Sequence, residues 1–254
     1  TAEYGCGLEG LILDRKKDLT GIVNGIDYDE WNPVTDSELA AHYSVEDLTG
    51  KKKNKTKLLK DNHLPLKRKD TPVLGIISRL ADQKGFDIIA EVADEILSLD
   101  IQMVILGTGE AKYHELFQML QQKYPKKIAT NLKFDAYLAK MIYAGSDLFL
   151  MPSRFEPCGL GQMIALAYGT IPIVRETGGL ADTIQDFNAQ TQTGTGFVFS
   201  KYSSNELLRT VKHAVEIYQN KNQWSILQSN AMKSDCSWDA SAKRYTELYF
   251  SCIS

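Results

Sequence analysis

Residues 72–85 read PVLGIISRLADQKG, in which a short apolar run, Val73 to Ile77, is followed at once by polar residues and a glycine. Comparable runs occur at residues 103–106, 148–151, 171–174 and 197–199, and a weaker one lies at residues 131–134. Continuous apolar runs of about four to eight residues, without alternation of polar and apolar positions, are typical of strands buried on both faces of a parallel sheet. We therefore expect each run to form a buried strand.

Segments with helical periodicity separate these runs. The first places apolar residues on one helical face at Phe86, Ile89, Ala90, Ala93, Ile96 and Leu97, and the second does so at Tyr113, Leu116, Phe117 and Leu120. Repeated strand–helix units predict an α/β fold, a doubly wound parallel sheet of Rossmann type. Ligands of such sheets bind beyond the carboxyl ends of the strands, so the residues after each run are the candidates for a site.

Composition excludes several classes of function. The chain has 254 residues and is 43% hydrophobic, so it can bury a large core. Its net charge is -3, whereas nucleic-acid binding favours a clearly basic protein. The basic run from Lys51 to Lys60 is interpreted as a solvated helix or linker. No apolar run is long enough for a membrane span. The scattered cysteines and histidines predict reduced thiols and no metal site.

Charged residues follow two of the predicted strands. Arg79 and Lys84 come after the first, where fixed positive charge could bind a diphosphate, although both could also be solvated surface cations. Glu156 lies in SRFEPCGLGQ, residues 153–162, just before a glycine-rich turn, where its carboxylate could accept hydrogen bonds from sugar hydroxyls or simply favour a helix start. A second glycine-rich loop, ETGGLAD, covers residues 176–182. Together these features predict a site for a phosphorylated ligand.

Two further strand ends carry weaker signals. Gly107 and Gly109 follow the second run, but Lys112 stands where a dinucleotide-binding fingerprint would have its third glycine, so no NAD site is predicted. Phe134 follows the third run, and its ring could stack on a nucleobase or cap the core.

Taken together, the motifs are more specific than any one of them. SRLADQKG at 78–85, SRFEPCGL at 153–160, TGGLAD at 177–182, and the initial EYG, GLEG, GIVNGID and WNP segments resemble the bacterial glycogen and plant starch synthases over essentially the whole chain. The resemblance implies the GT-B architecture of two Rossmann-like domains facing each other across a cleft, with this chain as the C-terminal, nucleotide-sugar-binding one. It also implies retaining transfer of glucose from ADP-glucose to α-1,4-glucan, without a metal or cofactor.

The same resemblance assigns roles to individual residues. It implies that Arg79 and Lys84 contact the diphosphate, that Glu156 holds the glucosyl hydroxyls, and that Phe134 lies near the adenine. The remaining donor-binding residues are expected to be Cys158, Gly159, Leu160, Gly161, Thr177 and Gly178, largely through backbone groups. Gly161 departs from many relatives, which have a hydroxyl residue there, so one ligand contact is expected to be lost.

The resemblance divides the chain into three parts. Residues 1–70 are expected to connect the two domains and enter this one, residues 71–235 to form the ADP-glucose-binding core, and residues 236–254 to form a closing helix. The N-terminal domain, with most of the glucan-binding surface, is the expected partner and lies outside this sequence. The resemblance implies the cytoplasm of a bacterium, or a plastid in a plant or alga, with no nucleic-acid or membrane partner.

Two other readings stay open. The chain could be a nucleotide-sugar-binding module without chemistry of its own, or part of another GT-B glycosyltransferase with a different donor. Sucrose- or trehalose-type enzymes often have a second glutamate eight residues after the first, but here Ile164 occupies that position.

Overall fold

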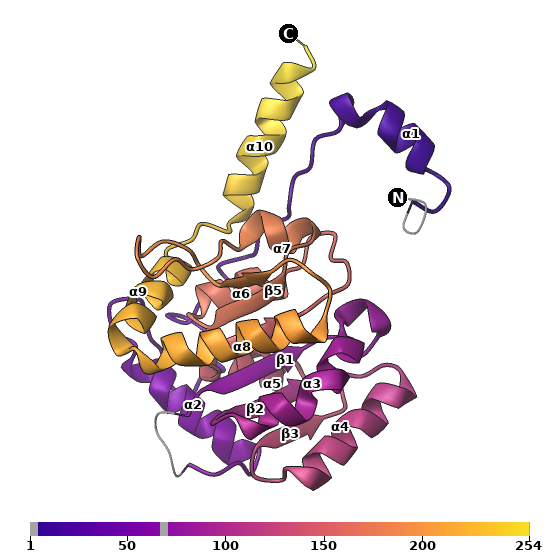
Figure 1. Cartoon of the computed structure of the whole chain (residues 1–254). Helices are drawn as coiled ribbons and strands as arrows, with labels where there is room; N and C mark the ends of the chain where they lie inside the picture. The colour runs from indigo at the N-terminus through magenta and orange to yellow at the C-terminus, as the bar shows by residue number, and fades with distance from the viewer. Residues whose placement is uncertain (1–4, 67–70, 254) are drawn as a thin grey trace.

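The computed structural model describes residues 5–66 and 71–253; Glu3 and Tyr4, part of the expected connecting segment, lie outside these ranges. Within the described residues, six strands form one sheet in the order β3-β2-β1-β4-β5-β6, and all paired neighbours are parallel. The strands are β1 (Val73–Ile77), β2 (Gln102–Leu106), β3 (Ile128–Asn131), β4 (Leu148–Met151), β5 (Ile171–Arg175) and β6 (Phe197–Phe199). The predicted doubly wound parallel sheet is confirmed (Figure 1).

The third strand lies earlier in the chain than predicted. The sequence pattern placed it at residues 131–134, whereas β3 pairs with β2 from Ile128 to Asn131. Only Ile128 and Ala129 are buried in this strand, so its apolar run is too short to stand out from its polar neighbours. Phe134 consequently lies in the loop after β3 and not at the end of the strand itself.

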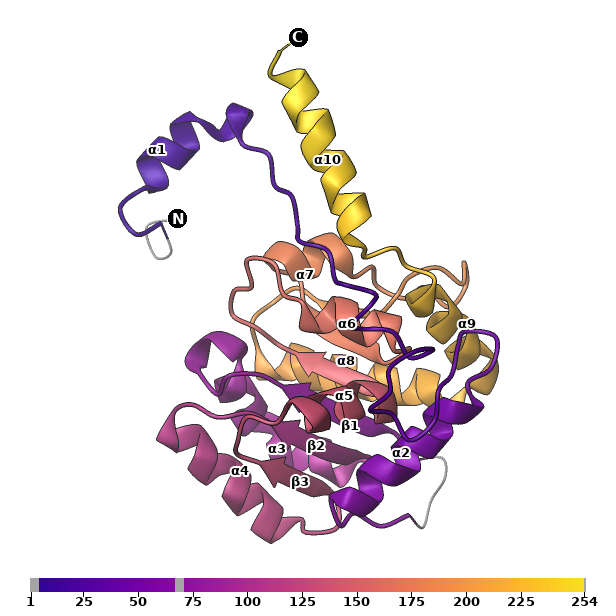
Figure 2. The same cartoon turned by 180° about the vertical axis from the view of Figure 1, so that it is seen from behind.

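Helices cover both faces of the sheet. The helices α3 (Phe86–Ser98), α4 (Ala111–Lys123), α7 (Gly178–Thr183), α8 (Ser204–Gln219) and α9 (Lys221–Met232) contribute to one apolar cluster. The helices α2 (Thr49–Asp61), α5 (Ala136–Gly145) and α6 (Gly161–Ala167) contribute to a second. Turning the molecule by 180° brings α2 to the front and sends α8 behind the sheet (Figures 1 and 2).

The basic run Lys51 to Lys60 forms most of α2, and the interpretation of this run as a solvated helix or linker is wrong for two of its lysines. Lys51 is buried, and its ammonium group donates to the carbonyl oxygen of Tyr168 at 2.9 Å and to Oγ1 of Thr170 at 2.7 Å. Burial lowers the pKa of Lys51 to about 7. Lys55 forms an ion pair of 2.7 Å with Asp147. These lysines attach α2 to the core.

Two helices extend away from this core. The helices α1 (Glu9–Asp14) and α10 (Trp238–Ser251) protrude on the same side of the molecule in both views (Figures 1 and 2). The start of α10 lies beside the incoming chain, since Oγ of Ser241 donates to the carbonyl oxygen of Val23 at 2.9 Å. In the part of the chain that the structure describes, no helix combines the length and the apolar character that crossing a membrane requires.

Candidate functional site

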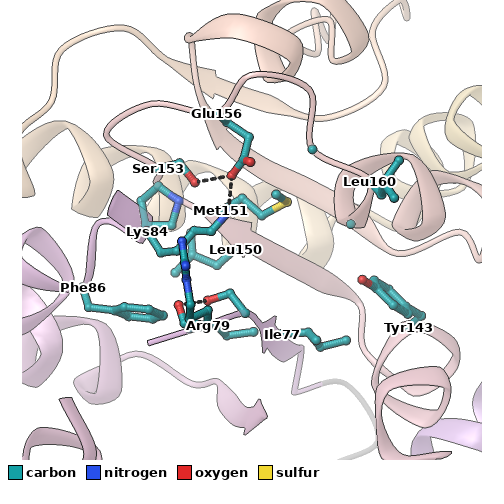
Figure 3. A pocket seen from close by; sticks show the side chains of 15 residues that line it. Ile77, Arg79, Lys84, Phe86, Tyr143, Leu150, Met151, Ser153, Glu156 and Leu160 are labelled. Carbon is teal, nitrogen blue, oxygen red and sulfur yellow. Dashed lines mark hydrogen bonds and ion pairs between the residues drawn. The ribbon is translucent and has the colours of Figure 1, made fainter. Parts of the chain in front are cut away.

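A cavity of about 350 Å³ lies at the carboxyl ends of β1 and β4. These strands are neighbours in the sheet, but the chain leaves β1 toward β2 and leaves β4 toward β5. The loops after them therefore diverge and leave a crevice, which is the usual ligand position in a doubly wound sheet. The polar and glycine residues lining it include Ser78, Arg79, Lys84, Tyr143, Ser153, Glu156, Gly159 and Gly161 (Figure 3).

Lys84 and Glu156 form an ion pair inside this cavity. Nζ of Lys84 lies 2.6 Å from Oε2 of Glu156, and the two side chains are only 19% and 8% exposed. Oγ of Ser153 donates to the same carboxylate oxygen at 3.1 Å (Figure 3). Such charge-assisted hydrogen bonds are about twice as strong as neutral ones, so the pair fixes the orientation of both side chains.

The approach of two loops brings this pair together. Gly85, just after Lys84, has a left-handed backbone with φ 78°, and a Cβ there would overlap the carbonyl oxygen of Pro152. The backbone N–H of Arg154 also donates to the carbonyl oxygen of Gln83 at 2.8 Å. The loop after β1 therefore lies directly against the loop after β4, which only glycine at position 85 permits.

Arg79 lines the cavity and is exposed to solvent. Its guanidinium donates to Oε1 of Gln83 at 3.1 Å, and within residues 5–66 and 71–253 the structure gives it no acidic partner. With Lys84 it supplies two positive charges against the single carboxylate of Glu156. The cavity is therefore suited to an anionic ligand, and guanidinium groups bind phosphate oxygens in a fixed geometry.

Of the two glycine-rich loops, the one at residues 153–162 lines the cavity and the one at residues 176–182 lies behind it. Gly159, Leu160 and Gly161 line the cavity, whereas Thr177 and Gly178 do not. A Cβ on Gly178 would overlap the carbonyl oxygen of Glu156, so the second loop lies close behind the first. The second loop thus supports the first from outside the cavity.

Two other predicted site residues also lie outside the lining. Sγ of Cys158 accepts a hydrogen bond from the backbone N–H of Asn24 at 3.4 Å, which joins the first glycine-rich loop to the N-terminal segment. Phe134 is 90% exposed in the loop after β3, so its ring does not cap the core.

Tyr143, on α5, lines the cavity although nothing in the sequence singles it out. It lies in the apolar stretch AKMIYAG, residues 139–145, where a tyrosine looks like a core residue. Burial raises the pKa of its phenol well above the ordinary value. Only the fold shows that this side chain reaches the same cavity as Arg79 and Lys84.

Comparisons with known proteins agree with this architecture. Residues 60–227 match the family described as Glycosyl transferases group 1. The chain is 52% identical to a glycogen synthase of Kosmotoga olearia, over 98% of this chain and 52% of that protein, and 53% identical to one of Fervidobacterium nodosum, over 97% and 50%. It therefore spans about half the length of the curated relatives it matches.

A solved structure of a starch synthase is also similar to this chain. The catalytic domain of starch synthase IV from Arabidopsis thaliana, bound to ADP and acarbose, matches with a TM-score of 0.91 and 39% identity, over 98% of this chain and 52% of that one. A sucrose-phosphate synthase from Thermosynechococcus elongatus, at 19% identity and a TM-score of 0.63, shares the fold alone. The chain has the α/β fold of GT-B glycosyltransferases. It belongs to the family of glycosyl transferases group 1.

Proposed function

We propose that this chain is the donor-binding half of a glycogen (starch) synthase that transfers glucose from ADP-glucose to the non-reducing 4-hydroxyl of α-1,4-glucan with retention of configuration. The observation that carries the proposal is the cavity at the carboxyl ends of β1 and β4, which Arg79, Lys84 and Glu156 line and in which Lys84 is paired with Glu156. Identity of about half to glycogen synthases over nearly the whole chain supports this choice of reaction.

The positions of the charges suggest how the donor binds. Arg79 and Lys84 bind the diphosphate, and the carboxylate of Glu156 accepts hydrogen bonds from glucosyl hydroxyls. Because Lys84 and Glu156 are in contact, the sugar and diphosphate positions adjoin, and the bond between them lies within the cavity.

During transfer, the acceptor 4-hydroxyl oxygen bonds to the anomeric carbon while the bond from that carbon to the β-phosphate oxygen breaks. The hydroxyl proton leaves with ADP, and the two cations stabilise the negative charge that develops on the departing diphosphate. No oxidant or reductant takes part in this exchange. We expect no metal or cofactor to be required.

The remaining predicted residues complete the donor site in this proposal. Backbone groups of Gly159, Leu160 and Gly161 contact the sugar and phosphate, since these residues line the cavity. Cys158, Thr177 and Gly178 hold that loop in place. The exposed ring of Phe134 is free to stack on the adenine.

The other half of the enzyme is the proposed partner. Large apolar side chains are exposed on the two protruding helices and just beside them: Leu8, Leu11, Ile12 and Leu13 at α1, and Trp238, Tyr249 and Phe250 on α10. Exposed apolar surface of this kind is typical of contact surfaces. We propose that the N-terminal domain covers it, and that the enzyme acts in the cytoplasm of a bacterium.

The test is a transfer assay on the longer protein that contains this chain, with glycogen as acceptor and ADP-glucose or UDP-glucose as donor. Incorporation from ADP-glucose, at a clearly higher kcat/KM than from UDP-glucose, is expected. Incorporation from UDP-glucose alone would identify another donor class. Binding of ADP-glucose by the longer protein without any transfer would identify a non-catalytic module.

A further inference from the structure

Tyr143 is held rigidly beside the cavity by other aromatic rings. It is 5% exposed, and its ring centroid lies 5.0 Å from that of Phe149, 5.8 Å from that of Trp31 and 6.2 Å from that of Tyr168. Aromatic pairs at these separations stabilise one ring orientation. The position of the hydroxyl group is therefore fixed before any ligand binds.

The hydroxyl group of Tyr143 is directed into the cavity and has no hydrogen bond to any described residue. Figure 3 shows the phenol oxygen on the side of the ring that faces Leu160 and the cavity. The other buried tyrosines of the described residues have partners: Tyr43 with the carbonyl oxygen of Tyr168, Tyr168 with Asp36, Tyr113 with Asp82, and Tyr218 with Lys55. The ring of Tyr143 is buried, but its hydroxyl oxygen is not among the buried unpaired atoms of the described residues, so the oxygen is accessible from the cavity. The hydroxyl group is therefore available to a partner that arrives with the ligand.

Gly161 leaves room for this hydroxyl. A Cβ at position 161 would lie 3.2 Å from the phenol oxygen of Tyr143 and 3.1 Å from Cε1 of Phe149. Gly161 does not have a positive φ, so space and not backbone conformation explains the glycine. Many relatives have a hydroxyl residue at position 161, so the glycine there predicted the loss of one ligand contact. In this chain the hydroxyl group of Tyr143, on α5, lies next to that position at the cavity.

The chemistry of the cavity indicates what this hydroxyl binds. Since burial raises its pKa, the phenol stays protonated at neutral pH and acts as a donor. Arg79 and Lys84 in the same cavity favour an anion, and the strongest acceptors of an O–H group are anionic oxygens.

We propose that the hydroxyl group of Tyr143 donates a hydrogen bond to a diphosphate oxygen of the nucleotide-sugar donor. Tyr143 is then a third diphosphate ligand beside Arg79 and Lys84, supplied by a helix that the motifs do not include. This inference rests on the proposed function, because it takes the ligand of the cavity to be a nucleoside diphosphate.

The test compares Tyr143→Phe with Tyr43→Phe in the longer protein. Tyr43 is the matched control because it is equally buried but donates its hydroxyl to a protein carbonyl at 2.8 Å. ADP affinity is measured by calorimetry and the melting temperature by differential scanning calorimetry. Tyr143→Phe should lower ADP affinity and kcat/KM for ADP-glucose by about ten-fold or more, the effect of one hydrogen bond to a charged group. Its melting temperature should not fall, since the hydroxyl has no partner in the free protein.

Tyr43→Phe should do the reverse, with a lower melting temperature and unchanged ADP affinity. If wild type binds ADP and Tyr143→Phe binds it within about two-fold of wild type, less than the effect of one such hydrogen bond, the inference is overturned and the proposed function stands. If wild type binds neither ADP nor ADP-glucose, both are overturned.

Discussion

The ammonium group of Lys84 lies 2.6 Å from Oε2 of Glu156, although the two residues are 72 positions apart in the chain. One comes from the loop after β1 and the other from the loop after β4, so the contact exists only where these loops meet at the reversal of strand order. The pair links a cation suited to phosphate with a carboxylate suited to sugar hydroxyls. Its two members should therefore affect binding and turnover differently.

Replacement of Glu156 by Gln should lower kcat/KM for ADP-glucose by about 10- to 100-fold, because a charged acceptor for the sugar hydroxyls is lost. ADP affinity should not fall, since a negative charge near the diphosphate is removed. Steady-state kinetics and ADP titration of the longer protein measure the two effects. Ser153→Ala is the control, because it removes only a hydrogen bond to Glu156 and should have a smaller effect. Intact turnover in Glu156→Ala would rule out the proposed role.

Replacement of Arg79 by Ala should weaken ADP binding by about ten-fold or more, since a charge-assisted contact to phosphate is lost. Stability should change little because Arg79 is exposed and its side chain makes only the hydrogen bond to Gln83 within the described chain. Lys123→Ala is the control, because Lys123 is an exposed cation on α4, paired with Asp94 outside the cavity. Equal ADP affinities in the two variants would show that Arg79 is merely a solvated cation.

Replacement of Gly179 by Ala should destabilise the protein by about 2–3 kcal/mol, the usual upper range for overpacking. The new Cβ would overlap the carbonyl oxygen of Cys158, and backbone cannot move aside as a flexible side chain can. Gly21→Ala is the matched control, since nothing lies within 4 Å of a Cβ at that position. Urea unfolding measures both variants. A Gly179→Ala protein as stable as Gly21→Ala would contradict the close support of the first glycine-rich loop by the second.

Lys51 should make stability depend on pH. Burial lowers its pKa to about 7 in the folded protein, from an ordinary value of 10.5. Between these values the unfolded chain binds the extra proton, so this residue's contribution makes the free energy of unfolding rise with pH, by up to about 1.4 kcal/mol per pH unit. Urea unfolding at pH 7, 8 and 9 should show this slope in wild type and lose it in Lys51→Met. The same slope in both proteins would refute the assignment.

The strands and the site residues at their ends could be predicted from the sequence. The runs at 73–77, 148–151 and 197–199 coincide with β1, β4 and β6, because strands covered on both faces must be apolar throughout. Ligands of doubly wound sheets bind beyond the carboxyl ends of the strands, and Arg79, Lys84 and Glu156 do meet in one cavity there.

Other features depend on tertiary contacts that no local pattern records. Lys51 belongs to a run that looks fully solvated, yet it is buried against Tyr168 and Thr170. Tyr143 lies in an apolar helix, and only the crossing of α5 and α6 brings its hydroxyl next to Gly161. Both residues carry a polar group at the end of a largely apolar side chain. The surrounding sequence therefore does not predict where that polar group lies.

The decisive experiment is a calorimetric titration of the longer protein with ADP-glucose, alongside an Arg79→Ala, Lys84→Ala double variant. Wild type should bind ADP-glucose, and the double variant should lose that binding while keeping the melting behaviour of a folded protein. Unchanged affinity in the double variant would place the donor elsewhere and contradict the assignment of the cavity at the carboxyl ends of β1 and β4.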